Sequence, residues 1–239
     1  MIYPCQITDF KSIENQVICG NCLDMMKLIP DKSIDLVLTD PPYSIHAESD
    51  GGLHKTNPWL RNVHNAGIDS FNPYEFLKQC ERVCKNMHAY IFCAKNNLKD
   101  YIDFITKKEW NWEILIYAKR NPIPTKNNKY LSDKEYCLFV RAKNCYFNNN
   151  LEFEKYKTVQ YVNIGNSEFN HPTVKNLEYI KDRILFSSNE GDLILDPFLG
   201  SGTTARACKD LGRRFIGIEI SEKYCEIACD RLRQSVINF

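Results

Sequence analysis

Two short stretches of the sequence contain residue types that are suited to chemistry. The first, Asp40-Pro41-Pro42-Tyr43, follows the apolar, β-rich run Ile34–Thr39. The second, the glycine-rich stretch Asp196–Thr204, follows a similar run at 193–195. Such short apolar runs are typical of buried parallel strands, and ligands bind at the carboxyl ends of these strands in open α/β sheets. Both stretches are therefore candidates for a functional site at one edge of a sheet.

The glycine-rich stretch predicts a site for a nucleoside cofactor. Gly200 and Gly202 allow the backbone to approach a ligand closely, and Glu219 ends the next strand-like run, Arg214–Ile220. A carboxylate about twenty residues after the glycines can hold both hydroxyls of a ribose. A glycine-rich turn without a ligand and an NAD-dependent oxidoreductase are the alternatives. The oxidoreductase is disfavoured because a nicotinamide-binding half needs several strands after the glycines, and only one such run remains.

Together, the two stretches resemble the amino-methyltransferases of DNA, in the group whose catalytic motif precedes the motif for S-adenosylmethionine (AdoMet). The resemblance extends to residues 20–24, 116–122, 135–139 and 171–175. It implies direct methyl transfer from AdoMet to adenine N6 of a base flipped out of double-stranded DNA. Cytosine N4 is the alternative target, and it is disfavoured because the cytosine members more often carry serine at position 40. An RNA or protein-glutamine substrate and a non-catalytic nucleic-acid-binding relative are the remaining alternatives.

The resemblance assigns roles residue by residue. The catalytic group that it implies is Asp40, Pro41, Pro42 and Tyr43. The cofactor-binding residues that it implies are Asn21, Cys22, Thr173, Lys175, Asp196, Phe198, Gly200, Ser201, Gly202, Thr203 and Glu219.

Some of these roles are specific. Asp196 is expected near the methionine amino group and Glu219 on the ribose. The family usually has aspartate at position 21, and the amide oxygen of Asn21 is expected to accept the same hydrogen bond from the adenine amino group. The proline that the family has after Lys175 is replaced by Asn176.

The composition neither supports nor excludes a nucleic-acid partner. The net charge is +1, so DNA contacts must depend on local clusters of basic residues. One such cluster is Lys119, Arg120, Lys126 and Lys129, which either holds phosphates or forms a plain solvated loop. The resemblance leaves a homodimer and a cognate restriction endonuclease open as further partners.

The remaining sequence alternates between strand-like and helix-like stretches. Asn72 and Pro73 are typical of a helix start, Ser221 is a candidate cap for the last helix, and the run 88–93 is strand-like. Further strands are predicted at 112–117 and 135–140, and further helices at 73–85, 96–108 and 176–187. Another helix is predicted from the end of the glycine-rich stretch to about residue 211. The alternation predicts an α/β fold with a mostly parallel sheet and helices on both faces. The resemblance specifies a seven-stranded, Rossmann-like methyltransferase sheet.

The length of 239 residues and the 44% hydrophobic content favour a single domain over residues 1–239. The polar stretch 44–71 is interpreted as a mobile loop and the stretch 141–170 as a small target-recognition insertion.

The eleven cysteines are expected to be reduced. The first sixteen residues contain no apolar segment, so an intracellular, cytoplasmic location in a bacterium is expected, with a bacterial or phage gene. Cys19 and Cys22 have the spacing of half a zinc site, but no second pair follows, so no metal is expected. Cys225 and Cys229 are expected to pack on one face of a helix.

Overall fold

The computed structural model describes residues 1–42, 71–122, 130–163 and 174–234. In this part of the chain, eight strands form one sheet in the order β1-β8-β7-β2-β3-β5-β4-β6. The strands are β1 (Gln16–Cys19), β2 (Leu36–Thr39), β3 (His88–Cys93), β4 (Asn111–Lys119), β5 (Lys134–Arg141), β6 (Val159–Val162), β7 (Leu193–Asp196) and β8 (Arg214–Glu219). Strand β5 is antiparallel to β3 and β4, and the other pairings are parallel. The predicted mostly parallel sheet is confirmed, with eight strands instead of seven.

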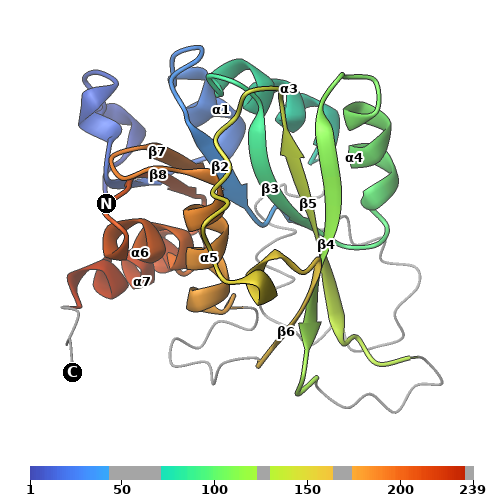
Figure 1. The fold of residues 1–239 in the computed structure, drawn as a ribbon. Coiled ribbons are helices and arrows are strands. Elements are labelled where there is room, and N and C mark those ends of the chain that lie inside the picture. The colour runs from blue at the N-terminus through green and yellow to red at the C-terminus, as the bar shows by residue number, and fades with distance from the viewer. Residues whose placement is uncertain (43–70, 123–129, 164–173, 235–239) are drawn as a thin grey trace.

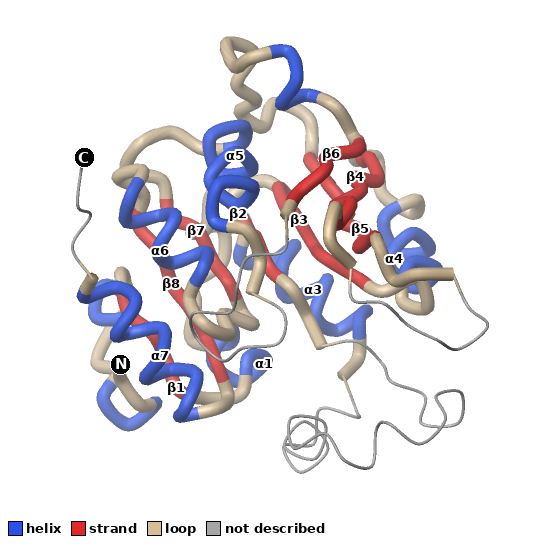
Figure 2. The backbone as a smooth tube through the Cα atoms, turned by 90° about the horizontal axis from the view of Figure 1, so that it is seen from below, coloured by secondary structure: helices blue, strands red, loops and turns tan. Residues whose placement is uncertain are grey.

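Helices cover both faces of this sheet (Figures 1 and 2). One face carries α1 (Cys22–Lys27), α3 (Pro73–Val83) and α4 (Leu98–Ile105), and the other carries α5 (Leu177–Ser187), α6 (Thr203–Asp210) and α7 (Glu222–Arg233). Short 3-10 helices at Pro4–Gln6 (η1) and Lys11–Ile13 (η2) precede β1, and η5 (Phe153–Tyr156) precedes β6. Two apolar cores result, one on each side of the sheet. No helix among the described residues is long and apolar enough to cross a membrane.

Local sequence signals explain several element boundaries. The side chain of Asn72 accepts hydrogen bonds from the N–H groups of Tyr74 and Glu75, so it caps α3 as predicted. Asn176 caps α5 in the same way. Ser221 occupies the N-cap position of α7, but its side chain makes no capping hydrogen bond there.

Strands β1 and β6 were not predicted from sequence patterns. β6 lies within the stretch 141–170 that was interpreted as an insertion, and it pairs in parallel with β4, so this part of the stretch extends the sheet. It is an edge strand with partly exposed residues along its length, which explains why it has no continuous apolar run. Most of the stretch 44–71 lies outside the described residues.

Candidate active site

The two predicted motifs meet at one edge of the sheet. β2 and β7 are neighbouring parallel strands, with Val37 opposite Leu195, so both chains reach the carboxyl edge together. The hydroxyl of Thr39, the last residue of β2, donates a hydrogen bond of 2.8 Å to the carboxylate of Asp196, the last residue of β7. Asp40 and the glycine-rich stretch therefore begin side by side, although they are far apart in the sequence.

The carboxylate of Asp40 is the first member of a chain of ion pairs. It pairs with the ammonium of Lys175, which precedes α5. Lys175 also lies 2.9 Å from the carboxylate of Glu135, and Glu135 lies 2.6 Å from the ammonium of Lys119. The four charges alternate in sign along the sheet edge from β2 to the β4–β5 pair. Because the Lys175 side chain is only 9% exposed, this network fixes the orientation of the Asp40 carboxylate.

Glu135 holds this network together electrostatically. Burial raises the pKa of its carboxyl, but the charges of Lys175 and Lys119 and their hydrogen bonds outweigh that effect and leave the pKa below its ordinary value. The ring of Phe92 lies 4.7 Å from the Lys175 ammonium and adds a cation–π contact. Glu135 therefore remains a carboxylate between two ammonium groups.

The glycine-rich turn between β7 and α6 is built around Glu219. The N–H of Gly200 donates to one oxygen of the Glu219 carboxylate at 2.9 Å, and the N–H of Ser221 donates to the other at 2.8 Å. Burial raises the pKa of this carboxyl. Each carboxylate oxygen has a second lone pair, so Glu219 retains the capacity to accept hydrogen bonds from a diol.

Gly202 has a packing role in the same turn. Its φ of +84° lies in the left-handed region, and a Cβ added there would lie 2.8 Å from the Cβ of Ala228 in α7. The close approach of α7 therefore requires glycine at this position, whether or not a ligand also binds there.

Phe198 is fixed by an aromatic cluster. Its ring lies 5.5 Å from that of Phe71 and 5.6 Å from that of Phe76, in edge-to-face arrangements. The side chain is partly buried, so these contacts hold it in place at the rim of the glycine-rich turn.

Asp196 is buried beneath the turn. Its carboxylate accepts hydrogen bonds from the hydroxyl of Thr39 at 2.8 Å and from the N–H of Phe198 at 3.1 Å. Burial nevertheless raises its pKa to about 6, against the lowering effect of these hydrogen bonds and of one from Thr204. Asp196 thus connects the two motifs, and its negative charge is poorly solvated.

This raised pKa predicts a specific pH dependence of stability. The folded protein holds the Asp196 proton more tightly than the unfolded chain, so the folded state loses stability as pH rises from about 4 to about 6, by roughly 3 kcal/mol. We expect Asp196→Asn to remove this loss, so that the variant gains stability relative to the native protein over that range. Urea unfolding at several pH values measures this difference in stability. The control is Asp230→Asn, because Asp230 belongs to an exposed ion pair. If the free energy of unfolding depends on pH in the same way for the native protein and for Asp196→Asn, Asp196 does not have a raised pKa.

Several other predicted cofactor residues make internal contacts. The amide oxygen of Asn21 accepts hydrogen bonds from the N–H groups of Leu23 and Asp24, so it caps α1. The hydroxyl of Thr203 accepts a hydrogen bond from Arg231 of α7 at 2.8 Å. Ser201 is buried in the turn, and Cys22, the first residue of α1, has a pKa raised to about 12 by burial.

The predicted basic cluster divides into two parts. Lys119 is not directed toward solvent for phosphate binding, because it is paired with Glu135 and its side chain is 17% exposed. Arg120 is exposed, and its guanidinium lies 5.9 Å from the ring of Tyr161. Lys126 and Lys129 lie outside the described residues, as do Tyr43 and Thr173. Pro41 and Pro42 continue directly from Asp40 at the sheet edge.

Sequence reasoning did not identify Glu135 as a site residue. The residue opens a stretch that matched the family's central strands, but nothing in its local pattern indicates two lysine partners from other elements. Cys19 and Cys22 have no metal-binding companions, since the described part of the chain holds no group of three or more potential ligands.

Comparisons with known proteins agree with this arrangement. The sequence profile of a family described as DNA methylase matches residues 34–230. The type II methyltransferase M.HinfI of Haemophilus influenzae is 30% identical over 254 residues, covering 92% of this chain and 68% of that protein. The DNA adenine methyltransferase YhdJ of Escherichia coli (strain K12) is 30% identical over 264 residues, covering 95% and 86%.

A solved structure extends the similarity to the fold. The M1.HpyAVI–SAM complex superimposes with a TM-score of 0.66 and 25% sequence identity, covering 91% of this chain and 99% of that one. Sequence profile, relatives and fold thus point to the same group of enzymes, and the chain belongs to the DNA methylase family.

Proposed function

We propose that this protein transfers a methyl group from AdoMet to the N6 amino group of adenine in DNA. The observation that carries the proposal is the meeting of the two motifs, since Thr39 contacts Asp196 and so brings Asp40 next to the glycine-rich turn. Asp40 supports adenine over cytosine, and the adenine methyltransferase YhdJ among the relatives supports the same choice. Cytosine N4 remains the second candidate, because the chemistry is shared.

The proposed reaction depends on activation of a weak nucleophile. The lone pair of an exocyclic amino nitrogen is delocalised into the base. When the Asp40 carboxylate and the Pro41 carbonyl each accept one amino hydrogen, the nitrogen approaches tetrahedral geometry and its lone pair becomes available. These acceptors stabilise the positive charge that develops on the nitrogen, so they favour the transition state over the ground state. In the proposal, Asp40 also accepts the proton that the nitrogen loses after transfer.

Lys175 adds a second element to this mechanism. Its ammonium holds the Asp40 carboxylate from one side and is itself held by Glu135. Such preorganisation lowers the reorganisation needed when the substrate arrives. In this proposal Lys175 and Glu135 position Asp40. The resemblance also implies that Lys175 lies near the methionine end of AdoMet, and this role agrees with its contact with Asp40 at the same sheet edge.

The described residues fit AdoMet as the cofactor. Bound AdoMet supplies an electrophilic methyl group on a sulfonium ion. In the proposal Glu219 binds the ribose with its remaining lone pairs, Phe198 lines the pocket, and the backbone of Gly200 permits close approach. The role that the resemblance gave to Asn21 requires a change, because its amide oxygen already caps α1. Its amide nitrogen is a hydrogen-bond donor and suits a ring nitrogen of adenine instead.

A base within a duplex cannot reach this edge, so the proposal includes base flipping, at a cost of a few kcal/mol. Tyr43 is proposed to stack on the flipped base. The stretches 44–71 and 141–170 are proposed to recognise the sequence around it, since they flank the catalytic edge in the chain.

Arg120 and Lys119 provide a test of the DNA interface. We expect Arg120→Gln to reduce the slope of log affinity against log salt by about 0.9, as expected for the loss of one phosphate contact. Lys119→Met should leave that slope unchanged, because Lys119 is paired with Glu135. Fluorescence anisotropy of a labelled duplex between about 50 and 200 mM salt measures both slopes. Equal effects of the two variants would contradict the division of the basic cluster.

The proposed function is tested by incubation with radiolabelled AdoMet and mixed-sequence duplex DNA, followed by nucleoside analysis and mapping of the modified sites. The expected product is N6-methyl-2′-deoxyadenosine at one recurring sequence. N4-methyl-2′-deoxycytidine would establish the second candidate, and label that appears only in parallel incubations with RNA or protein would overturn a DNA substrate.

The same proposal includes two protein partners and a location in the cell. A cognate restriction endonuclease is supported by the similarity to type II methyltransferases, and a cytoplasmic location in a bacterium suits an enzyme of DNA. A homodimer is proposed from the short length of the 141–170 stretch.

A further inference from the structure

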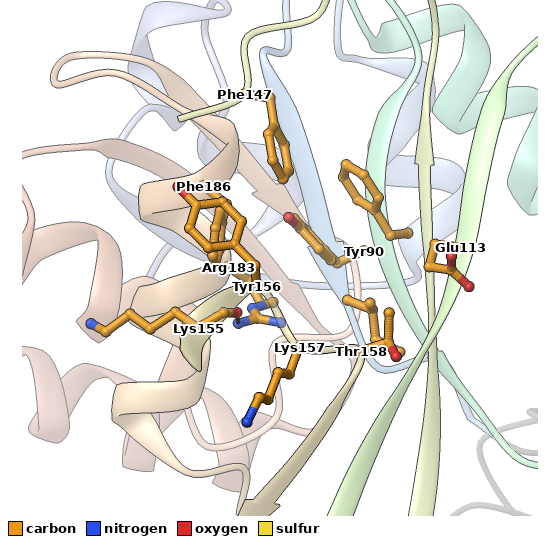
Figure 3. Close-up of a pocket in the computed structure, with 11 residues that line it drawn as sticks. Tyr90, Glu113, Phe147, Lys155, Tyr156, Lys157, Thr158, Arg183 and Phe186 are labelled. Carbon is orange, nitrogen blue, oxygen red and sulfur yellow. Dashed lines mark hydrogen bonds between the residues drawn. The ribbon is translucent and has the colours of Figure 1, made fainter. Parts of the chain in front are cut away.

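A pocket lies away from the catalytic edge, between the sheet and α5. It has a volume of about 170 Å³, and residues of η5 and those that follow it contribute to its lining (Figure 3). Tyr90 and Phe139 are opposite each other in the β3–β5 register and form its floor, whereas Cys93 ends β3 at the catalytic edge. Glu113, near the start of β4, also lines the pocket. The site is therefore separate from Asp40 and the glycine-rich turn.

Five of the eleven lining residues are aromatic. The rings of Tyr90 and Phe139 are stacked at 4.8 Å, and those of Phe147 and Phe186 are stacked at 5.4 Å. The ring of Tyr156 meets Phe186 edge-on at 4.9 Å. A cavity of about 150 Å³ with apolar walls can hold benzene, so the volume of this pocket suits a single six-membered ring.

A buried positive charge lines the same pocket. Arg183 of α5 is 3% exposed, and its guanidinium is permanently charged. Figure 3 shows its side chain on the α5 side of the pocket, beside Tyr156 and Phe186. Among the described residues, its guanidinium donates one long hydrogen bond of 3.4 Å, to the Lys155 carbonyl. Its Nε has no hydrogen-bond partner in this part of the chain.

No carboxylate in the described part of the chain forms an ion pair with Arg183. Among the described residues, Lys155 pairs with Asp182 and Lys157 with Glu154, but no ion pair includes Arg183. The rings of Tyr179 and Phe186 lie 4.6 and 5.0 Å from its guanidinium and stabilise it in part. A buried charge without a counter-ion is costly, and a planar carboxylate is the group that a guanidinium binds best.

We propose that this pocket binds a small planar anion, namely a single aromatic ring that carries one carboxylate. The ring packs against the aromatic walls, and the carboxylate accepts hydrogen bonds from Arg183. The inference is independent of methyl transfer, because none of the residues that carry it lies at the catalytic edge.

The test compares three probes by isothermal titration with the full-length protein in the absence of AdoMet and DNA. Benzoate has the ring and the charge, benzamide has the ring alone, and acetate has the charge alone. We expect benzoate to bind at least about tenfold more tightly than either of the others. If benzamide binds as tightly as benzoate, the pocket does not require a negative charge in its ligand. If acetate binds as tightly as benzoate, the pocket does not require an aromatic ring. Either result would overturn the proposal.

Variants then locate the site. We expect Arg183→Gln to weaken benzoate binding by at least about tenfold. Because this buried change can also affect folding, the second variant is Glu113→Gln at the exposed side of the pocket. It removes a negative charge near the anion and should tighten binding about twofold. Glu109→Gln makes the same change of net charge at a fully exposed position outside the lining and should have no effect. Identical affinities of the two glutamate variants would overturn the location.

Discussion

Asp40→Ala is expected to abolish methyl transfer while AdoMet binding remains nearly unchanged. The Asp40 carboxylate is the proposed acceptor for the amino hydrogen and the developing charge, and loss of one such group costs about 10²- to 10³-fold or more in rate. Glu219 and Phe198, the proposed cofactor residues, are held by contacts that do not involve Asp40. Single-turnover methylation and equilibrium binding of AdoMet measure the two effects separately.

The fold should tolerate this substitution. Lys175 keeps its contact of 2.9 Å with Glu135 when the Asp40 carboxylate is removed, so its charge remains partly balanced. Asp103→Ala is the matched control, because it removes a carboxylate from an exposed ion pair with Lys99 on α4. Substantial methylation by Asp40→Ala, or a parallel loss of AdoMet affinity, would refute the assigned role.

Gly202→Ala is expected to destabilise the protein by about 2 to 5 kcal/mol. The left-handed backbone of Gly202 costs about 1 to 2 kcal/mol for a residue with a Cβ. The added methyl group would also lie 2.8 Å from the Cβ of Ala228, and overpacking of this kind costs about 1 to 3 kcal/mol more. Urea unfolding gives the change in free energy of unfolding.

Gly191→Ala separates the two contributions. Gly191 has a similar φ of +81°, but nothing lies within 4 Å of a Cβ added there, so this variant should show the backbone cost alone. Combining Gly202→Ala with Ala228→Gly should recover part of the difference, as a favourable coupling in a double-mutant cycle. If Gly202→Ala and Gly191→Ala lose the same stability, close packing against α7 is not the reason for the glycine.

The sequence alone was sufficient to predict features that depend on neighbouring residues, such as helix starts and buried strands. Asn72 and Asn176 begin helices because their side chains bond to nearby N–H groups, and such contacts depend on neighbours within three residues. The runs that form β2 and β7 are fully buried strands and are recognisable from their apolar residues. The proposed catalytic motif and the glycine-rich turn were recognised for the same reason, since each follows such a run directly.

Only the tertiary structure decided how these features are combined. In sequence, Lys119 was a candidate for either phosphate binding or a solvated loop. It is instead the partner of Glu135, because the pairing of β4 with β5 sets Tyr117 opposite Glu135 and so makes Lys119 a diagonal neighbour of Glu135. The amide oxygen of Asn21 caps α1, and β6 joins the sheet without an apolar pattern of its own. Ion pairs, packing against Gly202 and strand order arise between residues distant in the chain, so their partners are set by the fold and are not encoded in any local pattern.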